Sequence, residues 1–359
     1  MRQGGASAIV RESAVSDAQA GRRNAALRRG FAAANAARGA SPLWRRLTCY
    51  NKSTPRSPGR RRQGGEMESS VGVIGLGQMG RGIASNLFRA GVLKAAFDPA
   101  PAARDLPFCR DVLFAAGREM AAACDVIVFV VPTSKEIAAN LDGPDGILSV
   151  ARPGQVILDL TTSDPARTRE LAQRAAAAGR AYLDCGMTGG AAGADAGTLT
   201  LMIGGDAAVL ERVRPVLAAF TRKAALVGPS GAGHTLKLIH NMVVHTNFLV
   251  MSEAGRLAEA SGLDLAAVVD VFNAGNARSF ISEVRFPNHI LSGRFDGRST
   301  VSNLAKDLAM AAAFADQRGE TAPYTHLTAD LLQRAMALGW AADDFTTIYP
   351  RLAELIDGA

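Results

Sequence analysis

Four polar side chains stand on the mostly apolar stretch 231–262. They are His234, Lys237, Asn241 and His245, and spacings of three and four residues place them on one face of a helix. Burial disfavours the charged form of a lysine, so it lowers the pKa of the ammonium group and fits that group to exchange a proton near neutral pH. Asn241 can hold the same substrate hydroxyl without changing charge. We interpret Lys237 as a general acid and base at an alcohol or carbonyl oxygen, with Asn241 as its partner.

A second chemical feature precedes this helix. The stretch from Cys185 to Gly205 contains seven glycines, more than a connection requires, because each glycine costs chain entropy when it is ordered. We interpret the stretch as a loop whose backbone amides approach a ligand closely. The hydroxyl of Thr188 and the amides of Gly189 and Gly190 would suit a small carboxylate. A mobile surface loop is the alternative.

The stretch "VGVIGLGQMGRG", which begins at Val71, places three glycines between an apolar run and a helical pattern. Gly75 permits a tight turn, Gly77 lets the backbone approach a pyrophosphate, and Gly80 lets the following helix pack closely on the strand. The pattern predicts a dinucleotide-binding loop. Its predicted cofactor-binding residues are Gly75, Leu76, Gly77, Gln78, Met79 and Gly80.

An acidic residue stands where such a site needs one. Asp98 ends the second apolar run and can accept hydrogen bonds from the adenosine ribose. A 2′-phosphate at about 4 Å from this carboxylate would be repelled by about 1 kcal/mol in water and about 4 kcal/mol at an effective dielectric of 20. We therefore expect NAD rather than NADP, although Arg104 nearby keeps NADP as an alternative.

The elements that position these residues are visible as short apolar runs. The runs at 71–74, 93–98, 125–132 and 154–160 alternate with Ala-rich helical patterns, which is typical of strands buried on both faces of a parallel sheet. The stretch 231–262 has no proline and predicts one long helix. The chain is therefore expected to be α/β, with a doubly wound parallel sheet followed by helices.

The basic charge of the chain is confined to its beginning. Residues 1–65 contain thirteen Arg and one Lys against two acidic residues, a net charge of +12, while residues 66–359 carry a net charge of −5. Their composition predicts a disordered tail over residues 1–66. We favour a passive tail or a start assigned too early, since Met67 stands just before the first strand. A targeting segment and a basic nucleic-acid arm are the alternatives.

Composition also argues against several classes of function. No apolar run reaches the roughly eighteen residues of a membrane helix. The cysteines and histidines form no CxxC or HExxH pattern, so no metal site is expected. With an acidic remainder, we expect no nucleic-acid partner and a cytoplasmic protein, with organelle targeting by the tail as the alternative.

Five motifs in order resemble the β-hydroxyacid dehydrogenase family, which includes 3-hydroxyisobutyrate dehydrogenase, tartronate semialdehyde reductase and 6-phosphogluconate dehydrogenase. They are "GLGQMG", "DLTTSDP", "DCGMTGGAAGADAGTLTLMIGG", "GAGHTLKLIHN" and "KDL" at Lys306–Leu308. The resemblance implies an NAD-binding Rossmann domain at 67–230, joined by a long helix to an all-helical substrate and oligomerisation domain at 231–359. It also implies a homodimer or homotetramer.

Residue by residue, the resemblance assigns the catalytic lysine to Lys237, the orienting asparagine to Asn241 and the substrate carboxylate seat to Thr188, Gly189 and Gly190. Further cofactor-binding positions are Val131, Pro132, Thr162 and Lys306. Two departures affect the substrate pocket. Thr188 stands where the family usually has serine, and His240 stands where it usually has asparagine, which leaves substrate size and polarity open.

The resulting hypothesis is hydride transfer between NAD and a small 3-hydroxy acid of the 3-hydroxyisobutyrate kind, with Lys237 as general acid and base. A non-catalytic dinucleotide-binding protein on the same scaffold is an alternative from another class. A 6-phosphogluconate-like or an imine-reducing relative is a further alternative.

Overall fold

The computed structural model describes residues 69–357. The tail predicted at residues 1–66 lies outside the described residues. All of the described residues belong to the compact unit that begins at Gly65.

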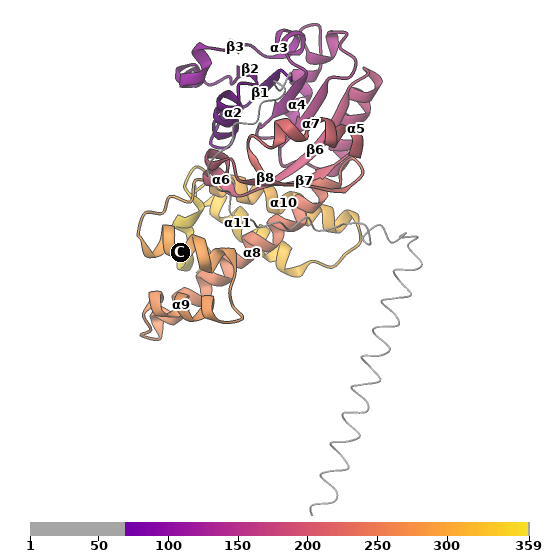
Figure 1. The fold of residues 1–359 in the computed structure, drawn as a ribbon. Helices are drawn as coiled ribbons and strands as arrows, with labels where there is room; N and C mark the ends of the chain where they lie inside the picture. Colours follow the sequence, from indigo (N-terminus) through magenta and orange to yellow (C-terminus); the bar gives the residue numbers. More distant parts are fainter. Residues whose placement is uncertain (1–68, 358–359) are drawn as a thin grey trace, which may run out of the picture. The chain divides into compact units, whose positions relative to one another are not determined.

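An eight-stranded sheet occupies the first half of this unit, with the order β3-β2-β1-β4-β5-β6-β7-β8. The α/β fold with a Rossmann domain followed by helices is thus confirmed (Figure 1). The strands are β1 (Val71–Ile74), β2 (Leu93–Phe97), β3 (Leu113–Phe114), β4 (Val126–Phe129), β5 (Val156–Asp159), β6 (Ala181–Thr188), β7 (Leu199–Gly204) and β8 (Thr221–Gly228).

One pairing departs from the parallel sheet that the sequence predicted. Strands β6 and β7 are antiparallel, while the other neighbouring strands are parallel. Only residues 189–198 connect β6 to β7, and they hold the short helix α6 (Gly190–Ala196). A parallel crossover needs a dozen or more residues, so this connection can only return the chain in the opposite direction.

Helices cover both faces of the sheet. One apolar cluster joins the sheet to α2 (Gly80–Arg89) and α7 (Ala207–Leu217). A second cluster joins the opposite face to α3 (Gly117–Ala123), α4 (Ser134–Leu141) and α5 (Pro165–Ala177). Successive side chains of a strand point to opposite faces, which is why Val73 belongs to the first cluster and Ile74 to the second.

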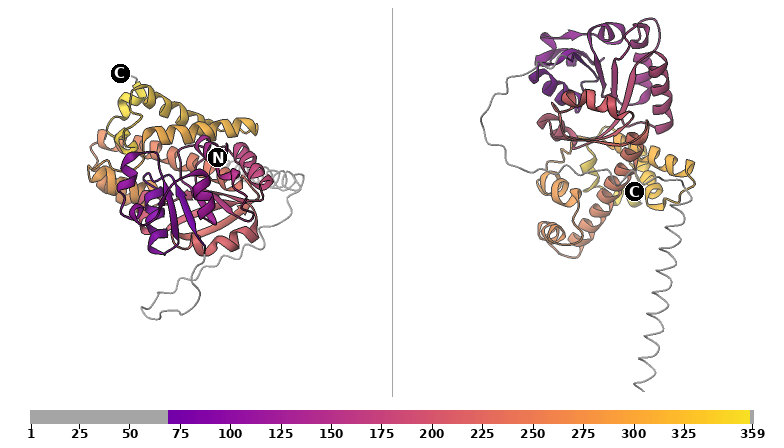
Figure 2. Two further views of the ribbon diagram at one scale, coloured as in Figure 1. Left: turned by 90° about the horizontal axis from the view of Figure 1, so that it is seen from above. Right: turned by 45° about the vertical axis from the view of Figure 1, so that its right-hand side comes forward.

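The predicted long helix is confirmed as α8 (Ala232–Ala260), a helix of 29 residues. Figures 1 and 2 show it running from the sheet into the helices drawn in orange and yellow. Its second half packs into a separate apolar core. That core is completed by α9 (Leu265–Ala274), the π-helix η5 (Ile281–Leu291), α10 (Val301–Gln317), α11 (Pro323–Ala337), the short helix η6 (Phe345–Ile348) and α12 (Leu352–Asp357).

Two of the seven glycines in the stretch 185–205 lie against α8. The stretch is the end of β6, then α6, then β7, so the expectation that it forms one loop was wrong. A Cβ at Gly186 would lie 2.6 Å from the Cβ of Lys237, and a Cβ at Gly204 would lie 2.5 Å from the carboxylate of Asp184. These two positions need glycine because the helix lies so close, whatever ligand is bound.

Asp184 anchors the beginning of α8 to β6. Its carboxylate accepts hydrogen bonds from the amides of Gly231, at 2.7 Å, and His234, at 3.0 Å, and it is fully buried. The N-cap residue of α8 is Gly231, which has no side chain to cap the helix. A carboxylate from the neighbouring strand therefore satisfies amides that would otherwise be unpaired and interacts favourably with the helix dipole.

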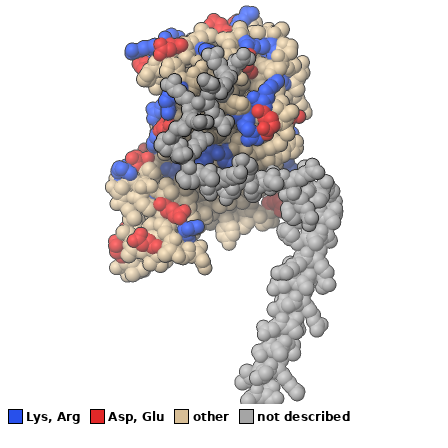
Figure 3. All heavy atoms as spheres, viewed as in Figure 1, with Lys and Arg blue, Asp and Glu red and all other residues tan. Residues whose placement is uncertain are grey.

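The surface of the described part shows no concentration of one charge on the face seen in Figure 3, where basic and acidic side chains are interspersed outside the grey atoms. Among residues 69–357, no helix is both long enough and apolar enough to cross a membrane.

We predict that Asp184→Asn destabilises the protein by about 1–3 kcal/mol, because the amide cannot accept both hydrogen bonds in a buried site. The measurement is the midpoint of urea unfolding. Asp206→Asn is the matched control, since Asp206 also accepts from two amides, at the start of α7, but on the surface. Asparagine is as good an N-cap as aspartate, so the control should unfold like the wild type. An equal loss of stability in both variants would contradict the anchoring role of Asp184.

Candidate active site

The loop between β1 and α2 has three glycines in three different situations. Gly75 has a φ of 96°, and a Cβ there would lie 2.2 Å from the carbonyl oxygen of Val130. A Cβ at Gly80 would lie 1.8 Å from the carbonyl oxygen of Gly75. At Gly77 a Cβ would meet no described atom within 4 Å, so the backbone there faces open space. Helix α2 begins at Gly80 and directs its amino end toward the same loop.

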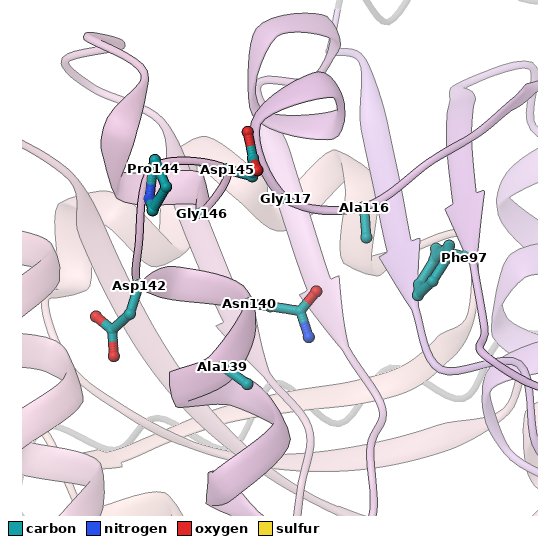
Figure 4. A pocket seen from close by; sticks show the side chains of 9 residues that line it. All are labelled: Phe97, Ala116, Gly117, Ala139, Asn140, Asp142, Pro144, Asp145 and Gly146. Atoms are coloured by element: carbon teal, nitrogen blue, oxygen red, sulfur yellow. The ribbon is translucent and has the colours of Figure 1, made fainter.

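Asp98 follows β2 directly and ties the glycine loop to it. Its carboxylate accepts from the amide of Leu76 at 2.7 Å and from the amide of Ala100 at 2.9 Å. Beside it lies a cavity of about 430 Å³ between the end of β2 and helix α4. Figure 4 shows Asn140 pointing from α4 toward the ring of Phe97, with Ala116 above them. No pattern in the sequence indicated this cavity.

A chain of polar contacts connects α8, α10 and the end of β4. Lys237 donates from Nζ to Oδ1 of Asn241 at 2.7 Å, and Asn241 donates from Nδ2 to Oδ2 of Asp307 at 2.6 Å. Lys306 pairs with Asp307 at 3.4 Å and donates to the carbonyl oxygen of Pro132 at 3.0 Å. Four of the sequence-predicted residues, Lys237, Asn241, Lys306 and Pro132, thus come together in one network.

Burial lowers the pKa of Lys237 to about 8; Asp307 opposes this shift and Lys306 adds to it. His240 lies within reach of the same amide, with Nδ1 at 3.1 Å from Oδ1 of Asn241. Because that oxygen only accepts, Nδ1 must carry the proton. Burial and the charge of Lys237 lower the pKa of His240, so it is neutral at neutral pH.

The predicted carboxylate seat lies on the same face of β6 as the stem of Lys237. Gly186 contacts that stem, and Thr188, two residues further, points to the same face about 7 Å along the strand. Gly189 and Gly190 follow, both with positive φ, where α6 begins. The hydroxyl of Thr188 makes no hydrogen bond within residues 69–357.

His234 does not join this site, although its spacing placed it on the face of Lys237. Its ring is fully buried and contacts the hydroxyl of Thr168 at 2.7 Å and the carbonyl oxygen of Asp159 at 3.2 Å. It connects α8 to α5 and β5. His245 remains on the Lys237 side, and its Nε2 atom is buried without a hydrogen-bond partner in the described part of the chain.

Comparison with known proteins decides the family. Residues 70–228 match the family described as the NAD binding domain of 6-phosphogluconate dehydrogenase, and residues 231–352 match the NAD-binding of NADP-dependent 3-hydroxyisobutyrate dehydrogenase. The 2-(hydroxymethyl)glutarate dehydrogenase of Eubacterium barkeri is 31% identical over 79% of this chain and 94% of its own length. The NAD-dependent L-serine dehydrogenase of Pseudomonas aeruginosa is 32% identical over 77% and 96%. The chain belongs to the β-hydroxyacid dehydrogenase family.

A solved structure of this family has the same architecture. The 3-hydroxyisobutyrate dehydrogenase of Mycobacterium tuberculosis with L-serine superposes with a TM-score of 0.72, at 31% identity, over 80% of this chain and 99% of that one. As a β-hydroxyacid dehydrogenase, the chain is an enzyme that acts on a CH–OH group with a nicotinamide dinucleotide.

The described residues fit such a cofactor. The open backbone at Gly77 follows β1, the carboxylate of Asp98 follows β2, and the cavity is lined by Phe97 at the end of β2. Val131 and Thr162 follow β4 and β5 at the carboxyl edge of the sheet, and both are half-buried. Parallel strands place such positions beside a bound dinucleotide. No group of residues in 69–357 has the composition of a metal site.

Sequence reasoning missed Asp307, although it stands inside the "KDL" motif beside Lys306. Its partner Asn241 is 66 residues away, so no spacing rule connects the two. The available signal was an acidic residue next to a lysine on a largely apolar helix.

We predict that Gly80→Ala and Gly77→Ala have different effects. Alanine at Gly80 must overlap the backbone of Gly75, so the thermal unfolding midpoint should fall. Alanine at Gly77 fits the free protein and should leave that midpoint nearly unchanged. It would occupy the space a pyrophosphate needs, so NADH should bind roughly tenfold or more weakly in a fluorescence titration. Wild-type NADH affinity in Gly77→Ala would contradict this assignment of the loop.

Proposed function

We propose that the protein transfers a hydride reversibly between NAD and a small 3-hydroxy acid, with Lys237 as general acid and base. The observation that carries this proposal is the contact of Lys237 with Asn241, which is itself bonded to Asp307. An ammonium group with a pKa of about 8 is suited to both directions of the reaction at physiological pH.

Each side chain of the site has a separate role in the reaction. Neutral Lys237 takes the proton of the substrate hydroxyl during oxidation, and its protonated form returns that proton to the carbonyl oxygen during reduction. Asn241 fixes the position of Nζ, since its Oδ1 accepts from Lys237 while Asp307 holds the other end of the amide. Thr188, Gly189 and Gly190 would hold the substrate carboxylate, and His240 would border the pocket. When bound, the nicotinamide supplies the hydride acceptor or donor.

For the cofactor we propose NAD. Asp98 is at the position that faces the adenosine ribose, and its charge disfavours a 2′-phosphate. Arg104, the basic residue that the sequence left as a partner for such a phosphate, lies over the ring of Phe114, with its guanidinium carbon 4.5 Å from the ring centroid. The cavity beside Phe97 and Asn140 would hold the adenine. Gln78, Met79, Val131, Pro132, Thr162 and Lys306 would contact the rest of the dinucleotide.

The substrate class is supported by the relatives rather than by a bound molecule. They act, by their names, on 2-(hydroxymethyl)glutarate, on L-serine and on 3-hydroxyisobutyrate. All three compounds carry a carboxylate and a hydroxymethyl group, which is the common feature we propose for this substrate.

Domain limits and assembly are also proposals. We propose a cofactor-binding domain at 67–230, a helical domain at 231–359, and a cytoplasmic homodimer or homotetramer. Exposed apolar side chains on α8 and α11 support assembly, for example Val250, Leu257 and Leu327. The particle mass in solution would decide it.

We predict opposite pH dependences for the two directions. The fraction of neutral Lys237 rises as pH increases through about 8, so kcat/KM for oxidation should rise and then level above that pH. The protonated fraction falls over the same range, so the reduction rate should decline. The pKa of His240 is below its ordinary value, so His240 is not the group that titrates near pH 8. Steady-state rates between about pH 6 and 10 test this.

Lys237→Met provides the control for that assignment. It should lower kcat by about 10²–10⁴-fold, the usual contribution of general acid–base catalysis, and abolish the transition near pH 8. NADH affinity should stay close to the wild-type value. A variant that retains both the rate and the pH profile would remove Lys237 from the reaction.

We predict a preference for NAD over NADP of about fivefold or more in kcat/KM, which follows from a like-charge repulsion of about 1–4 kcal/mol. Asp98→Asn keeps an oxygen for the amide of Leu76 and removes the charge, so it should reduce this preference. A wild-type enzyme that prefers NADPH would refute the cofactor assignment.

A further inference from the structure

Arg285 on the π-helix η5 is held by a backbone carbonyl, a histidine and two aromatic rings. Its Nη1 atom donates to the carbonyl oxygen of Gly297 at 3.0 Å and lies 3.4 Å from Nε2 of His289. Its guanidinium carbon is 5.4 Å from the ring centroids of both Phe280 and Phe345. Stacking between aromatic faces fixes the plane of a guanidinium without neutralising its charge.

His289 helps to fix this arrangement. Its Nδ1 atom lies 2.6 Å from a carboxylate oxygen of Asp296, which only accepts, so Nδ1 carries the proton in the neutral ring. The lone pair of Nε2 then faces Nη1 of Arg285. The guanidinium is thus oriented through a histidine rather than through a direct ion pair.

The other edge of Arg285 has no partner in the described part of the chain. Neither Nε nor Nη2 makes a hydrogen bond there, and no carboxylate lies within 4.0 Å of the guanidinium. Burial lowers the pKa of Arg285, and Asp344 only partly offsets that shift. Arg180 gives the contrast, since its Nε, Nη1 and Nη2 atoms all donate to oxygens of neighbouring residues. All three side-chain nitrogens of Arg180 are therefore hydrogen-bonded within the protein, whereas Nε and Nη2 of Arg285 are not.

One atom of the open edge, Nη2, lies beside the proposed substrate pocket. Nη2 lies 3.5 Å from the position that a Cβ of Gly190 would occupy, so it reaches the end of the predicted carboxylate seat. The charge of Arg285 also acts on His245, as does that of Lys237. Both cationic side chains thus lie near His245, whose buried Nε2 has no partner within residues 69–357.

We propose that Arg285 binds an anionic group of the substrate through its Nε and Nη2 atoms, at the Gly190 end of the pocket. This inference rests on the proposed function and deepens it. The edge formed by Nε and Nη2 presents two parallel N–H donors, which match the two oxygens of a carboxylate. The substrate is then a hydroxy acid with its acidic group on Arg285 and its hydroxyl at Lys237.

Two kinds of hydroxy acid meet this description. Arg285 can share the single carboxylate of a monoacid with Thr188 and Gly190, or it can bind the second carboxylate of a diacid while Thr188 holds the first. Propionate and glutarate distinguish the two, because neither carries a hydroxyl and neither is turned over.

The experiment measures binding of propionate and glutarate to the NADH-loaded enzyme by calorimetry, for wild type, Arg285→Met, Arg285→Lys and Arg278→Met. Removing a charged, bidentate partner should weaken binding by about 10- to 100-fold in Arg285→Met, with Arg285→Lys between it and the wild type. Weaker binding of both acids in Arg285→Met indicates that Arg285 shares a single substrate carboxylate with Thr188 and Gly190. Weaker binding of glutarate alone indicates that Arg285 binds a second carboxylate. Arg278 is an exposed arginine near the start of the same helix that pairs with Glu283, and its variant should bind as the wild type does.

Affinities in Arg285→Met equal to those of the wild type would overturn the proposal. If Arg285→Met does not fold, Arg285→Lys decides, because an unchanged affinity there contradicts bidentate binding. These outcomes are separable from failure of the proposed function, which would show as a wild-type enzyme that forms no NADH from any hydroxy acid.

Discussion

The site depends on how closely α8 approaches the sheet. Three positions without side chains, Gly186, Gly204 and Gly233, let the first turns of the helix lie directly on β6 and β7, where any Cβ would overlap a neighbouring atom. The carboxylate of Asp184 then holds the helix amides at that distance. Because α8 is a single helix of 29 residues, fixing its first turns fixes everything it carries. Lys237 is brought to the end of β6, and the second half of the helix forms the base of the helical core.

Given that placement, Asn241 determines the chemistry of Lys237. A carboxylate in direct contact would favour the ammonium form, and an apolar neighbour would favour the neutral amine. The amide does neither. Its oxygen accepts a hydrogen bond from Lys237 and its nitrogen donates one to Asp307, so the negative charge stays one side chain away from the ammonium group. The residual attraction of Asp307 is weaker than the effect of burial, and the pKa settles at about 8. The ion pair of Lys306 with Asp307 adds a second restraint, and the bond from Lys306 to Pro132 connects that restraint to the carboxyl end of β4.

Sequence patterns were sufficient where a feature is local. The glycine spacing of the first loop and the length of α8 are properties of consecutive residues, and both were predicted. The direction of β7 was not, because the many glycines of 185–205 were interpreted as one ligand-binding loop, while Gly186 and Gly204 lie against a helix that begins only at Ala232. His234 was placed with Lys237 by spacing alone, although polar contacts with α5 and β5 hold it elsewhere. Asp307 was missed because its partner Asn241 is 66 residues away. Arg285 was missed because it lies on the π-helix η5, where the usual helical spacing does not apply.

The charges around the pocket suggest why the substrate would bind in one orientation. Lys306 is compensated by Asp307, and Lys237 exchanges its proton close to neutral pH. In the described part of the pocket, Arg285 carries a permanent positive charge, and no carboxylate lies at ion-pair distance from it. An acid entering the pocket would therefore lower its energy most with its anionic group on Arg285, and this directs the hydroxyl-bearing carbon toward Lys237. The reverse orientation would place the anion beside Lys237, where it would raise the pKa of the amine and oppose the removal of the hydroxyl proton. The same unpaired charge would thus select the orientation and protect the basicity that the reaction requires.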